Sequence, residues 1–141
     1  MGRSECPPGP DELACLRCKG AALRALLAPA AMAVFECGRC GRQYARRPGR
    51  ALCFRWPHPI GRALYPVQFD RHPAPRAGAV AAMLARGASA AARASIAREI
   101  ALELGDPTQR VGDIVDCRAS EAELRRYLGL VVAHLESRPA G

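Results

Sequence analysis

The sequence is organised around two Cys-x-x-Cys pairs, Cys15–Cys18 and Cys37–Cys40, which are separated by eighteen residues. A two-residue gap lets both thiolates of a pair turn toward one point, so each pair supplies half of a tetrahedron. The eighteen intervening residues suffice for a hairpin that brings the second pair beside the first, a spacing typical of four-thiolate zinc sites. The sequence therefore predicts one metal site, whose ligands are Cys15, Cys18, Cys37 and Cys40.

We expect zinc at this site, because Zn²⁺ accepts four thiolates without a geometric preference of its own. Iron is the less favoured alternative: soft thiolates accept either metal, and two such knuckles also resemble a rubredoxin centre. A thioredoxin-like redox role is disfavoured, because that motif uses a single pair at a strand-to-helix turn. We further expect Gly20 to form the turn after the first pair, and Gly38 and Gly41 to let backbone N–H groups point at the sulfurs.

The positive charge of the sequence is concentrated in its first half. The net charge is +8, and twenty of the twenty-one basic residues are arginine. Residues 1–62 hold eleven Arg and Lys against four Asp and Glu, whereas residues 63–141 hold ten against nine. This asymmetry indicates an acidic partner for the metal-binding half, either a nucleic acid or an acidic protein surface.

Four segments are expected along the 141 residues. Prolines and glycines near the start predict a disordered lead-in over residues 1–12, followed by a zinc ribbon over residues 13–56. Five prolines predict an extended connection over residues 57–75, and alanine- and leucine-rich periodicity predicts a helical region over residues 76–141. The predicted fold class is α+β, with an N-terminal ribbon of small antiparallel hairpins and a helical C-terminal half.

Local patterns predict individual elements within these segments. Residues 21–31 are compatible with a short helix or an irregular loop, whereas residues 32–37 read as a strand. A further strand is conceivable over residues 63–69, and helices are expected over residues 76–86 and 89–104. The last helix is the clearest, since Ser120 and Glu123 form a capping-box pattern before one apolar face made by Leu124, Leu128, Val131, Val132 and Leu135.

The stretches Leu13–Gly20 and Phe35–Cys40, followed by Tyr44 and Gly49, resemble the small zinc-ribbon activator subunit of methyltransferases and its short bacterial relatives. The resemblance covers about Leu13–Phe54. It implies a subunit without catalytic residues that solubilises and activates a methyltransferase acting on tRNA, rRNA or a translation factor. It also implies that an apolar surface beside the ribbon pairs with an edge of the enzyme.

Two functions follow as expectations. The first is a non-catalytic zinc-ribbon protein that binds or activates another protein, with a methyltransferase as one candidate. The alternative is a nucleic-acid-binding ribbon that uses the arginine-rich stretch Arg39–Arg62, in which Tyr44, Phe54 and Trp56 could stack on bases. The arginines in question are Arg39, Arg42, Arg46, Arg47, Arg50 and Arg55.

We do not expect an enzyme. The three histidines are not at the spacing of a zinc-protease helix. Cys53 and His58 are close in the sequence, but this proximity alone does not make them a catalytic nucleophile and its base. Four thiolates also leave no open metal position for a catalytic water. The first residues lack the apolar core of a signal peptide, and no run is long enough to cross a membrane, so we expect a cytoplasmic protein, where reducing conditions keep thiolates available for metal.

Overall fold

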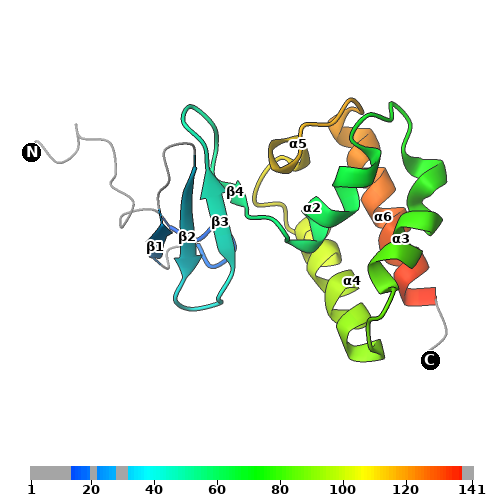
Figure 1. Cartoon of the computed structure of the whole chain (residues 1–141), viewed down its shortest axis with the longest axis horizontal. Coiled ribbons are helices and arrows are strands. Elements are labelled where there is room, and N and C mark those ends of the chain that lie inside the picture. The colour runs from blue at the N-terminus through cyan, green and yellow to red at the C-terminus, as the bar shows by residue number, and fades with distance from the viewer. Residues whose placement is uncertain (1–13, 20–21, 28–31, 138–141) are drawn as a thin grey trace, which may run out of the picture. The chain divides into compact units, whose positions relative to one another are not determined.

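The computed structural model describes residues 14–19, 22–27 and 32–137, so the predicted lead-in over residues 1–12 lies outside the described residues. The chain divides into two compact units, Met1–Arg55 and Trp56–Gly141, which we call the ribbon unit and the helical unit. Strands occupy the first unit and helices the second (Figure 1), so the predicted α+β class is confirmed. None of the described helices combines the length and the hydropathy that a membrane-spanning helix needs.

The ribbon unit contains a four-stranded antiparallel sheet in the order β1-β2-β3-β4. In the central pair, Phe35 of β2 lies opposite Tyr44 of β3, and Tyr44 lies opposite Phe54 of β4. All three aromatic side chains are buried, so they form the apolar centre of the sheet. The strands are β1 (Leu23–Leu27), β2 (Ala33–Cys37), β3 (Gln43–Arg46) and β4 (Cys53–Phe54).

The strand predicted over residues 32–37 is confirmed by β2, whereas the helix or loop predicted over residues 21–31 is wrong where β1 forms. The segment Leu23–Leu27 is rich in alanine and leucine, which favour helices in isolation. Pairing with β2, in which Leu23 lies opposite Cys37, overrides this weak propensity. Leu23 is 2% exposed, so the pairing also buries its side chain.

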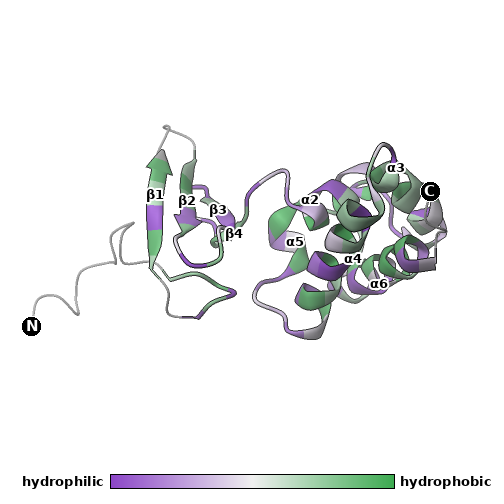
Figure 2. Cartoon of the chain, turned by 90° about the horizontal axis from the view of Figure 1, so that it is seen from below, coloured by the Kyte–Doolittle hydropathy of each residue, from purple (hydrophilic) through white to green (hydrophobic). Residues whose placement is uncertain are grey.

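The helical unit contains four α-helices of at least six residues, one single-turn helix and two short 3-10 helices among its described residues. In Figure 2, hydrophobic and hydrophilic stretches alternate along these helices, as expected for elements with one buried side. The elements are α2 (Pro59–Leu64), η2 (Tyr65–Val67), η3 (Ala74–Arg76), α3 (Ala77–Ala85), α4 (Ala90–Gly105), α5 (Val111–Ile114) and α6 (Glu121–Ser137).

Residues 57–75 were expected to be an extended connection, and here the structure differs. Pro59 occupies the first turn of α2, where backbone N–H groups have no acceptor within the helix. The missing N–H of proline therefore costs no hydrogen bond there, and its restricted φ suits the helix. The Nδ1 atom of His58 accepts a hydrogen bond from the Ile60 N–H at 3.1 Å and caps this helix. Ile60 and Leu64 are fully buried, so the segment belongs to the core of the helical unit rather than to a linker.

The predicted helix starts agree closely with the observed caps. The Ser89 hydroxyl accepts from the Ala92 N–H at 3.0 Å, and the Ser120 hydroxyl accepts from the Glu123 N–H at 3.2 Å. In a complete capping box the Glu123 carboxylate would accept from the Ser120 N–H. Here one oxygen of this carboxylate lies 3.0 Å from Nδ1 of His72. The predicted apolar face of α6 is confirmed, since Leu124, Leu128, Val131, Val132 and Leu135 are all buried.

Helix α6 is the centre of the helical unit, because both α3 and α4 pack along it. The Tyr127 hydroxyl donates to the Ala63 carbonyl at 2.6 Å and ties α6 to α2. Burial raises the pKa of Tyr127, so this hydroxyl keeps its proton at neutral pH. Glu103, which is 1% exposed, accepts from the Thr108 N–H at 2.6 Å and closes the loop after α4.

Candidate metal centre

The four predicted cysteine ligands come together at one point of the ribbon unit. Their Sγ atoms all lie within 4.8 Å of one another. The Sγ atoms of Cys15 and Cys40 are 3.8 Å apart, as are those of Cys18 and Cys37. Four sulfurs placed tetrahedrally at about 2.3 Å from a zinc ion would be about 3.8 Å apart. The arrangement therefore fits a tetrahedral four-thiolate metal ion.

Each cysteine pair is held by the same kind of turn. The Lys19 N–H donates to the Cys15 carbonyl at 2.9 Å, and the Gly41 N–H donates to the Cys37 carbonyl at 2.9 Å. Both turn residues have a positive φ, 52° at Lys19 and 77° at Gly41. Lys19 thus takes the left-handed position that the sequence suggested for Gly20, and Gly20 itself lies outside the described residues.

Backbone N–H groups point at two of the sulfurs, as predicted, although the donors differ from the expected glycines. Cys15 Sγ accepts from the Cys18 N–H at 3.3 Å. Cys37 Sγ accepts from the N–H groups of Arg39 at 3.3 Å and Cys40 at 3.4 Å. Such bonds favour the charged thiolate, the form that binds metal.

These surroundings shift the pKa values of the Cys37 and Cys18 thiols in opposite directions. Burial raises the pKa of the Cys37 thiol, but the hydrogen bonds from Cys40 and Arg39 outweigh burial and lower that pKa to about 7. Burial, together with the neighbouring cysteines, raises the pKa of Cys18 to about 12. A bound cation would reverse this second effect, because metal binding displaces thiol protons.

The Tyr44 hydroxyl contacts one of the four cysteines, Cys15, and this contact could not be predicted from the position of Tyr44 in the sequence. Its side chain is fully buried, and its hydroxyl lies 3.2 Å from Cys15 Sγ and 3.4 Å from the Arg17 nitrogen. The Arg17 N–H donates to this oxygen, so the hydroxyl proton is left to point at the sulfur. Burial, followed by the neighbouring Cys15, raises the pKa of Tyr44, which keeps that proton in place. The ring stacks on Phe54 at a centroid distance of 5.4 Å.

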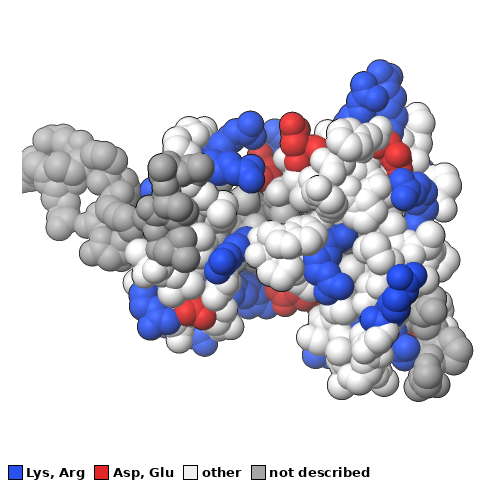
Figure 3. All heavy atoms as spheres, viewed as in Figure 1, with Lys and Arg blue, Asp and Glu red and all other residues white. Residues whose placement is uncertain are grey.

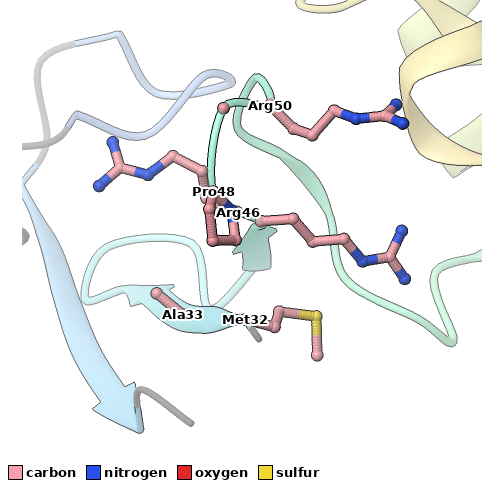
Figure 4. Close-up of a pocket in the computed structure, with 7 residues that line it drawn as sticks. Met32, Ala33, Arg46, Pro48 and Arg50 are labelled. Atoms are coloured by element: carbon pink, nitrogen blue, oxygen red, sulfur yellow. The ribbon is translucent and has the colours of Figure 1, made fainter. Parts of the chain in front are cut away.

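The six arginines predicted as a nucleic-acid site do not share one location. Arg39 and Arg42 lie on and just after the second cysteine pair, and Arg55 Nη1 donates to Gln43 Oε1 at 2.9 Å. The other three, Arg46, Arg47 and Arg50, line one pocket in the ribbon unit (Figure 4). Two of the expected stacking residues, Tyr44 and Phe54, are buried and so cannot receive a base.

Cys53, Cys117 and His58, which lie outside the four-cysteine cluster, each have surroundings of their own. Cys53 Sγ lies 3.7 Å from the Ala45 carbonyl oxygen, within the sheet of the ribbon unit. His58 Nε2 lies 3.0 Å from a carboxylate oxygen of Glu99, within the helical unit. Burial raises the pKa of Cys117 to about 11, so it is a poor nucleophile at neutral pH. Among the described residues, the four cysteines are the one group of three or more such side chains arranged for a metal.

Comparison with known proteins adds no family to this geometry: no protein family, no curated protein and no solved structure matches the sequence or the fold. The part of the chain that is described contains a zinc-ribbon-like module: an antiparallel sheet that carries a four-cysteine cluster able to hold a metal ion such as zinc.

Proposed function

We propose that this is a non-catalytic zinc-ribbon protein that binds or activates another protein, with a methyltransferase as the candidate enzyme. The observation that carries the proposal is the closure of four sulfurs around one point. A metal with four protein ligands has no open position for substrate or water, so it shapes a surface rather than reacting. The function then belongs to the surface that the metal holds rigid.

Strand β1 is the part of that surface suited to a protein partner. Among the described residues it is an outer strand of the sheet, preceded by an isolated bridge between Ala14 and Ala22, and is five residues long, whereas the other outer strand, β4, has two residues. An outer strand can offer backbone groups to an added strand, and Leu26, which is 39% exposed, adds an apolar contact. This edge agrees with the pairing that the resemblance to methyltransferase activators implies.

Zinc is the metal proposed for the centre, and iron is the alternative that a metal analysis would reveal. Iron held by four thiolates would colour the protein, whereas zinc has no such absorption because its d shell is full. A reducing compartment such as the cytoplasm suits the proposal, because it keeps thiolates free to bind metal.

Capture from native extract tests the protein-partner proposal when paired with a variant of the edge strand. Tagged wild-type protein should retain a methyltransferase in an equimolar complex that persists on gel filtration. Leu26→Lys should lose this enzyme while keeping one equivalent of metal, because the substitution lies on an exposed side chain. A wild-type protein that elutes with no enzyme, or a complex indifferent to Leu26→Lys and to metal removal, would count against the proposal.

Nucleic-acid binding is the second candidate, and one observation favours it. The described residues of the ribbon unit carry nine Arg and Lys side chains and a single acidic residue, Glu36. The Glu36 carboxylate forms an ion pair with Arg24, with 2.6 Å between Arg24 Nη2 and Glu36 Oε1. Four thiolates and one Zn²⁺ contribute a charge of about −2, so the surface remains strongly basic with metal bound. Figure 3 shows several basic side chains on the visible face of the ribbon unit.

Titration with a fluorescein-labelled oligonucleotide over a series of salt concentrations tests the second candidate. A basic surface that neutralises phosphates binds more weakly as salt rises, with a linear dependence of log Kd on log salt. Absence of binding at low salt would remove nucleic acid from consideration and leave the protein-partner proposal untouched.

A further inference from the structure

The loop between β3 and β4 is a rigid turn that displays arginines. In Arg47-Pro48-Gly49-Arg50, the Arg50 N–H donates to the Arg47 carbonyl at 3.0 Å. Gly49 has a φ of 73°, which a type II turn requires at its third residue, and proline is favoured at the second. Both central residues are therefore suited to one backbone conformation. The two arginines occupy the first and last positions of a stiff turn.

The same turn borders a pocket of about 400 Å³ that lies within the ribbon unit and is lined by Met32, Ala33 and the segment Arg46–Arg50. Three of its seven lining residues are arginines, and none is acidic. In the view of Figure 4, the side chains of Arg46 and Arg50 extend to the same side of the hairpin. The pocket therefore gathers positive charge without a carboxylate among the residues that line it.

Arg46 is held in position by the sheet. Its guanidinium carbon lies 5.9 Å from the centre of the Phe35 ring, a cation–π arrangement, and its backbone pairs opposite Ala33 of β2. Gly49 adds room, since a Cβ atom built there would meet nothing within 4 Å. A ligand can thus approach the turn backbone as well as the guanidinium groups.

We propose that this pocket, lined by Arg46, Arg47 and Arg50, binds backbone phosphates of a nucleic acid; the proposal rests on the second candidate function. Guanidinium groups bind phosphate oxygens through two parallel hydrogen bonds, and arginine keeps its charge at all physiological pH values. A pocket lined by three arginines and by no acidic residue suits a ligand that repeats its negative charge along a chain. Contacts of this kind position a nucleic acid but read no sequence, and no aromatic side chain lines the pocket for stacking.

The test compares two double variants with the same charge change in the same unit. Arg47→Gln/Arg50→Gln removes two of the three pocket arginines and leaves Arg46 in place. Arg39→Gln/Arg42→Gln removes the arginine within the second cysteine pair and the one just after it. The probes are a fluorescein-labelled single-stranded RNA and a DNA duplex of the same sequence, each titrated over a salt series. One equivalent of zinc in every variant is the control for folding.

The proposal predicts that Arg47→Gln/Arg50→Gln weakens binding about tenfold at about 0.1 M salt and lowers the salt slope by about two. The matched pair should weaken binding by less than about threefold. Equal losses in both variants would overturn the pocket while leaving nucleic-acid binding standing as a diffuse effect. No binding by the wild type would overturn both. Competition by polyglutamate as strong as by polyphosphate would assign the pocket to an acidic protein and overturn the proposal.

Discussion

The two units of this protein differ in how much apolar core their described residues bury. Among the described residues, the buried apolar set of the helical unit has nineteen members, whereas that of the ribbon unit has eight, two of which are Cys15 and Cys37 of the four-cysteine cluster. A small unit rarely offsets its conformational entropy by burial alone, so we expect a metal held by the four-cysteine cluster to supply the difference. We therefore expect the four cysteines to hold the ribbon unit together, whereas packing around α6 holds the helical unit together.

The largest effect should come from removing one metal ligand. Cys37→Ser deletes the sulfur that accepts two backbone N–H groups and leaves three thiolates. Binding of a structural zinc contributes on the order of 10 kcal/mol, so the ribbon should lose its metal and unfold while the helices persist. Metal analysis and amide NMR spectra measure the two outcomes separately.

Cys53→Ser is the matched control for this substitution, because Cys53 lies in the same unit but outside the cluster. It should keep one equivalent of metal and a folded ribbon. Retention of a full equivalent of metal by Cys37→Ser would show that the four cysteines do not act together.

The second effect should be confined to the helical unit. Leu128 is fully buried on α6, and truncation to alanine removes its packing and leaves a cavity. Leu128→Ala should lower the unfolding free energy of this unit by about 2–5 kcal/mol, as measured by denaturant unfolding followed by helical circular dichroism. Leu102→Ala, at a site that is 40% exposed, should change it by less than about 0.5 kcal/mol. Loss of metal in Leu128→Ala would mean that the two units do not fold independently.

A smaller effect should follow from deleting the hydroxyl beneath the metal centre. Tyr44→Phe keeps the ring that stacks on Phe54 but removes the hydrogen bond to Cys15 Sγ. Loss of such a supporting contact should weaken zinc affinity by about tenfold, measured by competition with a chromophoric chelator. Tyr65→Phe is the control, since Tyr65 is 60% exposed and belongs to the helical unit. Unchanged affinity in Tyr44→Phe would deny the hydroxyl its supporting role.

The smallest effect concerns the start of α6. Ser120→Ala removes the hydroxyl that accepts from the Glu123 N–H and should cost about 1 kcal/mol of helical-unit stability. Ser95→Ala, in the exposed interior of α4, should be neutral or slightly stabilising because alanine favours helices. Equal responses of the two variants in thermal unfolding would rule out Ser120 as a cap.

The sequence was sufficient to predict the clustering of the four cysteines because the paired cysteines follow a short spacing rule. Two residues between paired thiols restrict their geometry, whatever the intervening loop does. The caps at Ser89 and Ser120 were likewise predictable, since a cap depends on a hydroxyl and an N–H two or three residues apart.

Elements that depend on distant partners could not be predicted in the same way. Strand β1 has a helix-favouring composition, and only its pairing with β2 makes it extended. Helix α2 was hidden by prolines that suit its first turn as well as they suit an extended chain. The support that Tyr44 gives to Cys15 depends on strand register, which brings together residues twenty-nine positions apart.

Removal of metal from the wild-type protein tests the central claim most directly. Amide NMR spectra recorded before and after addition of a strong zinc chelator under reducing conditions follow both units at once. Our account predicts that the resonances of β1–β4 collapse to unfolded positions while those of α2, α3, α4 and α6 stay in place, and that added zinc restores the first set. A ribbon that keeps its dispersed resonances without metal, or helices that unfold with it, would contradict the account.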